Sequence, residues 1–405
     1  MKALVGVRKL AAALLTVLGV MGLTATLYAG YGPLPDRAPR QLRFLDGVLA
    51  SGRERQMQAL FPEGEFFTRV LTGLAEARSG ESHLAHARAR LAAIETPDSL
   101  QVFGSGMVPD HGIFAAGWSL ALAVAIAQAS GTEADRQVVR DHAQIVYDAL
   151  RQPGSPFAAS YPGQFWPCDS VVAAGSLAEA IALLGLPWRA DLVSWRQRAL
   201  AAADSETGLL AHQVDAQARA LVGPRGSSQA IIQTFWPALN TLAGAKDAQW
   251  QQFTGTFVAE RAGLLGVLEY PRGVPGAGDV DSGPLVFGVS LSASAVGLAA
   301  ARANGDRALA GRLTRQVELF GIPTGLQTTR YLFGLLPVAD AFIAWARTVP
   351  EGEPPISGGS GRSAWALAWT VPPLLVIVCG VALRPGKRRR RRNTTQSGQA
   401  AETAH

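Results

Sequence analysis

The chain has 405 residues, of which 48% are hydrophobic and 17% are charged, and its net charge is +6. This length and composition suit a large globular body with membrane segments and exclude a predominantly disordered chain. The block from Lys387 to Arg392 holds six positive charges, which leaves the rest of the chain near neutral, so we predict no nucleic-acid partner.

The first predicted element is an apolar segment that runs from Leu10 to about Tyr31 and follows Lys2, Arg8 and Lys9. As a helix it is long enough to cross a hydrocarbon core of ~30 Å. A secretory signal peptide has a shorter apolar region and ends in a small-x-small site, which the sequence TLYAG matches poorly. We therefore predict an uncleaved membrane anchor over 1–34, with a cleaved signal as the alternative.

The middle of the chain alternates between glycine- and proline-containing polar stretches and long apolar runs, with a period of roughly fifty residues that indicates an array of helical pairs. Runs such as 113–131 are apolar on nearly every face and predict buried inner helices, whereas amphipathic segments such as 133–151 predict outer helices. Strand-like alternation is nearly absent. We predict an all-α fold in which 35–350 form six helical pairs, an (α/α)6 toroid.

The end of the chain is predicted to return to the membrane. Residues 351–362 have the composition of a linker, and 363–383 form an uncharged apolar segment long enough for a second transmembrane helix. A strongly basic tail, 384–405, follows at once, as is typical of the cytoplasmic side. Both spans therefore place the 35–350 domain outside the cytoplasm, at the cell membrane.

In a closed ring of helical pairs the inner-helix N-termini converge at one end, where we expect a pocket beside the glycine-rich loops. These loops hold most of the concentrated ionisable and nucleophilic side chains. They are Glu63, Glu65, Asp110, His111, Cys168, Asp169, Arg225, Glu269, Arg272, Asp279, Asp281 and Asp340. Helix caps and turns also favour aspartate, so a structural role is the alternative for these carboxylates.

Cys168 is predicted to lie in the first turn of an inner helix, where the helix dipole lowers the pKa of a thiol. The other cysteine, Cys379, falls in the second span, so the outer domain has no disulfide framework. A buried, inert cysteine is the alternative. His111 follows Asp110 at another inner-helix start and could exchange protons with a neighbouring loop, with a capping or buried histidine as the alternative.

Arg225, in the stretch GPRGSSQ, is a candidate anion contact with Ser227 or Ser228 as the helix N-cap, although the stretch lacks the spacing of a phosphate loop. Asp279 and Asp281 superficially resemble a calcium loop, but the twelfth position is a serine where a bidentate glutamate is needed. The sequence contains no motif of a zinc, nicotinamide or serine-hydrolase site. We predict neither a metal nor a cofactor.

The segment order PDHGIFAAGWSL, then FWPCDSVVAAGSL, then GDVDSGPLVFGVSL and RYLFGLLPVADAF resembles that of linalool dehydratase/isomerase enzymes over about residues 100–347. The resemblance implies an (α/α)6 barrel, homo-oligomers, and cofactor-independent proton transfer that adds water to or removes it from an isoprenoid alcohol. Cys168 then takes the place of one catalytic cysteine and His111 that of the catalytic histidine. The family's other catalytic cysteine has no counterpart, because the matching place lies near Ala159.

Three functions follow from these observations. The first is an anchored extracytoplasmic lyase, hydratase or isomerase of a small-molecule, lipid-derived or envelope substrate, with Cys168, His111 and Asp169 transferring protons. The second is a carbohydrate-active toroid that cuts or binds envelope glycan, with two acids from Glu63, Glu65, Asp169, Glu269 and Asp281 and aromatic side chains as sugar platforms. The third is a non-catalytic scaffold. The predicted substrate contacts are Asp110, Tyr161, Phe165, Trp166, Arg225, Tyr270, Arg272, Asp279 and Asp281.

Overall fold

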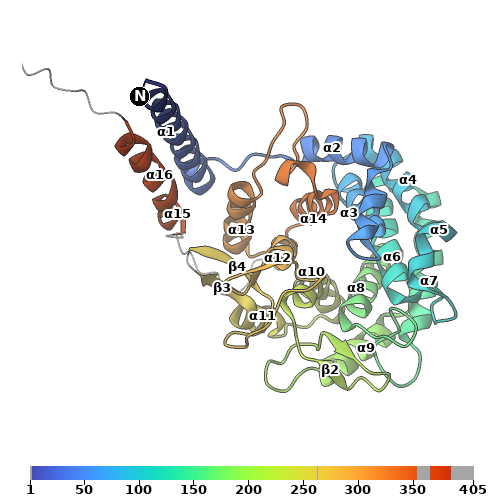
Figure 1. Cartoon of the computed structure of the whole chain (residues 1–405). Helices are drawn as coiled ribbons and strands as arrows, with labels where there is room; N and C mark the ends of the chain where they lie inside the picture. The colour runs from blue at the N-terminus through green and yellow to red at the C-terminus, as the bar shows by residue number, and fades with distance from the viewer. Residues whose placement is uncertain (1, 262, 354–364, 385–405) are drawn as a thin grey trace, which may run out of the picture. The chain divides into compact units, whose positions relative to one another are not determined.

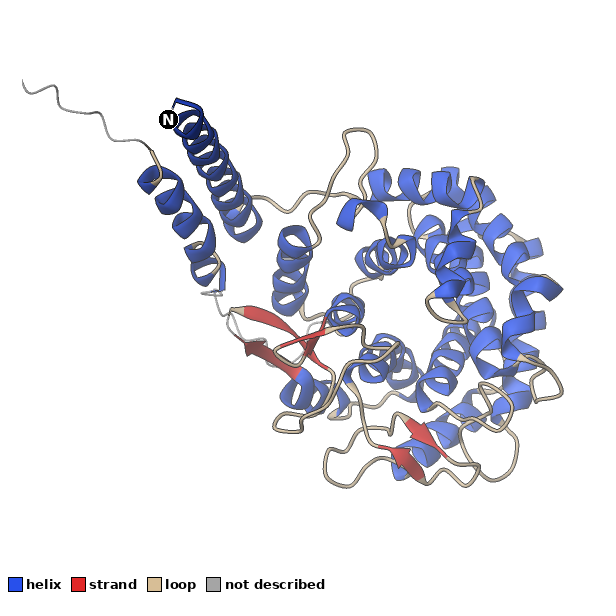
Figure 2. Ribbon diagram, in the orientation of Figure 1, coloured by secondary structure: helices blue, strands red, loops and turns tan. Residues whose placement is uncertain are grey.

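The computed structural model describes residues 2–261, 263–353 and 365–384, which fall into two compact units. The smaller unit consists of Met1–Leu27 and Trp369–His405, and the larger unit is Tyr28–Ala368. The described chain is mostly helical, as the all-α prediction requires, with strands confined to two small sheets (Figures 1 and 2). Most of the predicted linker and nearly all of the predicted basic tail lie outside the described residues.

The smaller unit is built from apolar helices. Most of α1 (Lys2–Tyr31) belongs to it, and Val5–Tyr31 is long and apolar enough to cross a membrane. Within the unit α1 packs against α16 (Val371–Ala382) at small residues, since a side chain added at Gly19 would meet Ile377 and one added at Gly380 would meet Thr16.

The second predicted span is broken. It consists of α15 (Trp365–Ala368), which ends the larger unit, and α16, and α16 is shorter than a membrane-spanning helix. Prolines at the first positions of α16 restart the helix after a two-residue turn at Trp369–Thr370, because proline is accepted in a first helical turn but not inside a helix.

In the larger unit the apolar helices pack one against the next in chain order, and the last packs against the first (Figure 2). They are α3 (Gly64–Ala77), α6 (Gly112–Ser130), α8 (Pro167–Leu184), α10 (Gly226–Ala243), α12 (Leu291–Ala303) and α14 (Pro337–Thr348). Each also contacts a more polar neighbour. These neighbours are α4 (Leu84–Ile94), α7 (Glu133–Leu150), α9 (Arg189–Ala201), α11 (Gln249–Phe257), α13 (Arg307–Phe320) and α2 (Ala38–Ala50).

The all-round apolar character of α6 and α8 results from burial. Both are long and apolar enough to cross a membrane, yet 83% and 78% of these segments are buried inside the larger unit. Gly117 of α6 lies against the backbone of Ala173 in α8, where a side chain would be 3.0 Å from that backbone. Among the three helices α1, α6 and α8, α1 is therefore the candidate membrane segment.

Aromatic rings fill the interior of this set of helices. Trp118 of α6 contacts Phe67 of α3 at 5.4 Å between ring centroids, Phe235 of α10 at 5.4 Å and Trp345 of α14 at 5.6 Å. Trp118 and Trp345 are fully buried. Since α6 is not a neighbour of α10 or α14 in the packing order, these contacts reach across the interior.

The strands were not predicted, because all are two to five residues long. One sheet pairs β1 (Gln213–Val214) with β2 (Ala220–Val222). The other is antiparallel in the order β3 (Val258–Arg261), β4 (Leu264–Leu268), β6 (Val289–Ser290) and β5 (Leu285–Val286). Short helical segments complete the unit, at α5 (Pro97–Leu100), η1 (Arg53–Ala59), η2 (Glu81–His83), η3 (Gln101–Phe103) and η4 (Leu332–Gly334).

Candidate functional site

The first turns of α8 and α10 and the start of α3 bring together a group of ionisable and nucleophilic side chains. Residues between helices, in the segment before β1 and in the 269–284 loop, complete it. We call this group the Cys168 cluster, and its members are Glu63, Cys168, Asp169, His212, Ser228 and Asp281.

Cys168 lies in the first turn of α8, where the sequence predicts it, and its side chain is buried. Its Sγ atom is 3.4 Å from Asp169 Oδ1, and the thiol also hydrogen-bonds with the hydroxyl of Ser228. The predicted lowering of the thiol pKa is wrong. Burial first, and then the charges of Asp169 and Asp281, raise the pKa of Cys168 well above its ordinary value. At neutral pH the group is a thiol, which can donate a proton but is a poor nucleophile.

Asp169 is also buried, and burial raises its pKa to about 7. Hydrogen bonds with the Ser160 hydroxyl and the Cys168 thiol oppose this rise, while the negative charges of Glu63 and Asp281 add to it. The carboxyl group is therefore divided between its acid and base forms near neutral pH, the condition that suits a general acid/base.

His212 is the cluster member that the sequence analysis missed. Its Nδ1 atom is 2.5 Å from the Ser228 hydroxyl, and its Nε2 atom is 3.6 Å from Asp281 Oδ2. Burial first, and then the positive charge of Arg225, lower the pKa of His212 to about 4, so the ring is neutral at pH 7. Together these contacts link the buried thiol of Cys168, through Ser228 and His212, to the half-exposed carboxylate of Asp281.

Glu63 and Tyr161 form the edge of the cluster. The Tyr161 hydroxyl donates a hydrogen bond to Glu63, the residue before α3. Burial, with a smaller effect of Asp281, raises the pKa of Glu63 although its backbone hydrogen bond lowers it. Tyr161 packs edge-on against Trp166, with 5.4 Å between ring centroids, so two of the predicted aromatic contacts lie beside the carboxylates.

The structure does not join His111 to Cys168. His111 precedes α6 with φ of 62°, and its Nδ1 atom is 2.6 Å from the carbonyl oxygen of Gly104. Its Nε2 atom is 3.6 Å from Asp110 Oδ2, and Asp110 in turn accepts a hydrogen bond from the backbone of Gly106. These contacts stay within the loop before α6 and favour the structural alternative for both residues.

Arg225 forms ion pairs with two carboxylates. Its Nε atom is 2.7 Å from Glu269 Oε1, and its Nη1 atom is 2.6 Å from Asp279 Oδ2. The guanidinium also lies over the ring of Tyr270, 5.4 Å from its centroid. Arg225 therefore anchors the 269–284 loop and is not a free anion contact. The predicted N-cap is also wrong, since Arg225 occupies that position and Ser227 and Ser228 lie inside α10.

The remaining predicted contacts hold loops. Asp279 accepts backbone hydrogen bonds from Asp281 and Ser282 at 3.1 Å each, in a turn, which is the structural alternative for this carboxylate. Tyr270 donates to the carbonyl of Ala277. Arg272 donates to the carbonyls of Gly255 and Val258, and Phe165 pairs through its backbone with Val214. Outside this set, Glu65 pairs with Arg69 at 2.7 Å along α3.

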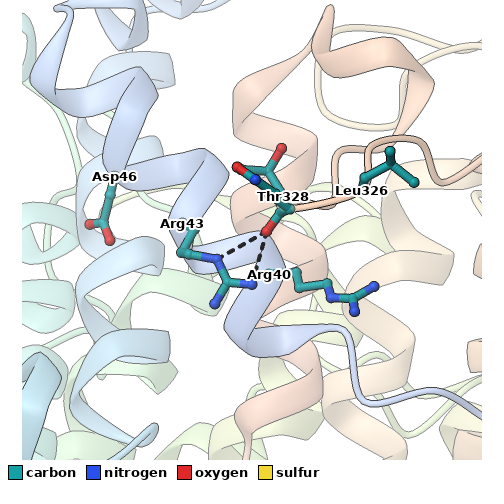
Figure 3. A pocket seen from close by; sticks show the side chains of 6 residues that line it. Arg40, Arg43, Asp46, Leu326 and Thr328 are labelled. Carbon is teal, nitrogen blue, oxygen red and sulfur yellow. Dashed lines mark hydrogen bonds between the residues drawn. The ribbon is translucent and has the colours of Figure 1, made fainter.

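Two cavities lie away from the cluster. One is an open depression of about 660 Å³ lined by Arg40, Arg43, Asp46, Leu326, Gln327 and Thr328 (Figure 3). The other, of about 450 Å³, lies where α7 and the turn that follows it, residues 151–153, meet α9. Neither is lined by a member of the Cys168 cluster. Because Cys168, Asp169, His212 and Ser228 are all buried, a substrate needs an opening in the covering loops.

Among the residues that the structure describes, one group of side chains has the spacing of a metal site. Asp46, Glu76 and His86 place ligand atoms within 4.8 Å of one another. However, Nη2 of Arg90 is 2.9 Å from Asp46 and 3.2 Å from Glu76, so a cation of the protein already neutralises these oxygens. We interpret the group as an ion-pair cluster between α2, α3 and α4.

No model of a protein family matches the chain, and no curated protein shows significant similarity to it.

Proposed function

We propose that the chain is a membrane-anchored extracytoplasmic enzyme that carries out cofactor-independent lyase, hydratase or isomerase chemistry at the Cys168 cluster. The observation that supports this most is an acid and a base held close together. Asp169, with a pKa of about 7, hydrogen-bonds with the Cys168 thiol, which in turn hydrogen-bonds with Ser228, the partner of a neutral His212. Perturbed groups that gather in this way are typical of sites that move protons.

In the proposed reaction one of these groups donates a proton to the substrate and another removes a proton from it. In dehydration, protonated Asp169 or the Cys168 thiol gives a proton to a hydroxyl group, the C–O bond breaks, and water leaves. A base, His212 or ionised Asp169, removes a proton from the neighbouring carbon, and the electron pair of that C–H bond forms the double bond. Hydration is the reverse, and adding the water back so that the hydroxyl group is restored at a different carbon gives an isomeric alcohol.

We assign the histidine role to His212 in place of His111. The resemblance to linalool dehydratase/isomerase enzymes matches Cys168 and His111 to catalytic positions, but the contacts of His111 are those of a turn. His212 is buried and is connected to Cys168 through the Ser228 hydroxyl. The assignment keeps the reaction type that the resemblance implies and changes the residue.

We further propose that α3, α6, α8, α10, α12, α14 and their outer partners form an (α/α)6 toroid. The packing of each inner helix on the next, and of α14 on α3, supports this. The membrane assignment is supported by the apolar Val5–Tyr31 segment. The basic residues at both chain ends favour a cytoplasmic tail and an outer catalytic unit. An anchored enzyme of this kind suits an isoprenoid or other lipid-derived substrate.

The test is to incubate the purified full-length chain with linalool or geraniol in D₂O and to follow water loss and deuterium uptake by mass spectrometry. We expect Asp169→Asn and His212→Gln to lower the rate about 10²–10⁴-fold, the usual contribution of a general acid or base. His111→Asn is the matched control, because asparagine accepts the left-handed conformation at position 111. Unchanged turnover in Asp169→Asn and His212→Gln would rule the proposal out.

The mutual influence of Glu63, Asp169 and Asp281 on their pKa values favours glycoside cleavage as a second candidate, since that reaction needs two neighbouring carboxyl groups. Tyr161 and Trp166 beside them would stack on sugar rings. Cell-envelope glycan is then the probe. Cleavage that survives Cys168→Ala and is lost in both Glu63→Gln and Asp281→Asn would select this function over proton transfer on an alcohol.

A further inference from the structure

The loop between α13 and α14, residues 321–336, presents large apolar side chains to solvent. We call it the 321–336 loop. Leu326 is 92% exposed, Leu335 is 73% exposed and Phe333 is 60% exposed, and Ile322, Leu332 and Leu336 are also exposed. The surfaces of soluble proteins rarely expose so many large apolar side chains in one short segment. An exposed apolar surface of this kind marks an interaction site.

The backbone of the 321–336 loop adopts an energetically unfavourable conformation at three bulky residues. Ile322, Leu332 and Phe333 have φ of 48°, 47° and 61°, in the left-handed region that bulky side chains rarely adopt. Hydrogen bonds fix the conformation, from Leu332 N to the Gly321 carbonyl at 2.7 Å and from Tyr331 N to Asp340 Oδ1 at 3.0 Å. The apolar side chains are therefore held outward by a specific structure.

Two arginines of α2 lie beside the loop, in the depression of Figure 3. Arg43 donates two hydrogen bonds, at 3.0 Å and 2.8 Å, to the carbonyl oxygen of Gln327, and the Thr329 amide donates to the carbonyl oxygen of Arg40. The structure gives the exposed guanidinium of Arg40 no hydrogen bond or ion pair with any described residue. The apolar loop thus has a positively charged rim with one cation available to a ligand.

The chain itself places this surface near the end of α1. Nη1 of Arg315 on α13 is 2.8 Å from the carbonyl oxygen of Gly32 and 3.1 Å from that of Ala29, where α1 ends. Arg37 pairs with Glu318 of α13 at 2.6 Å. Helix α13 then ends at Phe320, about 8 Å along its axis from Arg315, and the loop begins. If Val5–Tyr31 crosses a membrane, the loop starts close to where the chain leaves it.

We propose that the 321–336 loop, with Arg40 and Arg43, is a docking surface for an anionic phospholipid bilayer. Leu326, Phe333 and Leu335 enter the interface between headgroups and acyl chains, and the two arginines bind headgroup phosphates. The combination of projecting apolar side chains with a basic rim favours a bilayer, because the apolar side chains can contact the acyl chains while the arginines contact the anionic headgroups. The attachment of the C-terminal end of α1 to α13 favours a bilayer over a soluble partner.

The test uses the full-length chain, one copy per lipid nanodisc, with Cys379→Ala so that Cys168, which is buried, is the remaining native cysteine. Leu326→Cys carries a polarity-sensitive fluorophore, and Leu221→Cys, at a position that is 62% exposed on β2, is the matched control. In phosphatidylcholine with phosphatidylglycerol we expect a blue shift and quenching by lipid-borne quenchers at position 326 but not at 221. Arg40→Gln should lower the ratio of docked to free loop roughly fivefold.

Four outcomes would overturn the proposal. Emission at position 326 that matches position 221 in anionic nanodiscs shows that the loop stays in water. A blue shift at position 326 that is the same in pure phosphatidylcholine, and that Arg40→Gln does not change, shows that docking does not depend on anionic lipid. A shift in detergent that grows with protein concentration assigns the surface to a second copy of the chain. Failure to enter nanodiscs also overturns it, since the argument depends on the anchor. Thermal unfolding of each variant confirms that the fold is intact.

Discussion

The Cys168 thiol and the Asp169 carboxyl are neighbours in the first turn of α8, 3.4 Å apart, and both are buried. Their effects on each other are opposite in sign, since the charge of Asp169 raises the pKa of Cys168 while the hydrogen bond from the thiol lowers the pKa of Asp169. The thiol is therefore the donor and the carboxylate the acceptor over the neutral range. As the pH rises, Asp169 therefore loses its proton before Cys168 does.

Asp169 should make the protein less stable as the pH rises. Its folded-state pKa of about 7 is above its ordinary value of 3.8, so the folded state binds the proton more tightly. The resulting stability is fully present below pH ~4 and is lost as the pH rises through ~7, by up to about 4 kcal/mol. Asp169→Asn should flatten this part of the pH profile of thermal unfolding. A variant with the wild-type profile would contradict the assignment, since Glu76 and Asp340 also have raised pKa values and would then account for it.

Cys168 should resist alkylation at neutral pH. Each unit by which its pKa is raised lowers the thiolate fraction about tenfold, and burial limits access further. In the Cys379→Ala background we expect iodoacetamide to react at least about tenfold more slowly with Cys168 than with free cysteine. Asp169→Asn should move the pH dependence of the alkylation rate to lower pH, because it removes a negative charge that raises the pKa of Cys168. A rate equal to that of free cysteine would disprove the pKa direction.

Ser228→Ala should destabilise the protein by about 1–3 kcal/mol, because it leaves Nδ1 of the buried His212 without its partner. The double variant Ser228→Ala/His212→Leu should lose less than the sum of the two single changes, since both remove the same contact. Denaturant unfolding of the four proteins measures this difference. Strict additivity would show that the two side chains do not interact.

Arg225→Leu should be more severe, with a loss of about 3–5 kcal/mol, because it leaves the fully buried Glu269 without its cation and frees Asp279. Arg272→Leu is the matched control. Its guanidinium is exposed and bonds to backbone carbonyls, so we expect a loss of less than ~1 kcal/mol. Equal losses in thermal or denaturant unfolding would show that Arg225 does not anchor the 269–284 loop.

The sequence predicts the parts of the cluster that depend on local pattern. The apolar run after FWPCDS predicts α8, and with it the position of Cys168 in the first turn. His212 and Ser228 could not be matched to Cys168, because residues from three separate segments meet only when the helices close on themselves. One signal was present, since His212 follows the buried apolar segment Leu209–Ala211, an unusual place for a histidine.

The error in the thiol pKa has a related cause. A helix start is visible in the sequence, but burial and the carboxylate of Asp281, more than a hundred residues further along, are properties of the tertiary structure, and they outweigh the dipole. The strands were missed for a different reason. Two-residue strands such as β5 are too short for alternation to be detectable, and β4, LLGVL, is apolar throughout and resembles a helix segment.

The rings that meet at Trp118 have a kinetic consequence. Because Phe67, Phe235 and Trp345 reach it from three other helices, a layer of packed rings lies across the interior of the larger unit. Under the proposed function, this layer would make the loop end a dead end, in which release of one product precedes admission of the next substrate. An apolar product would then return to the side from which its precursor arrived.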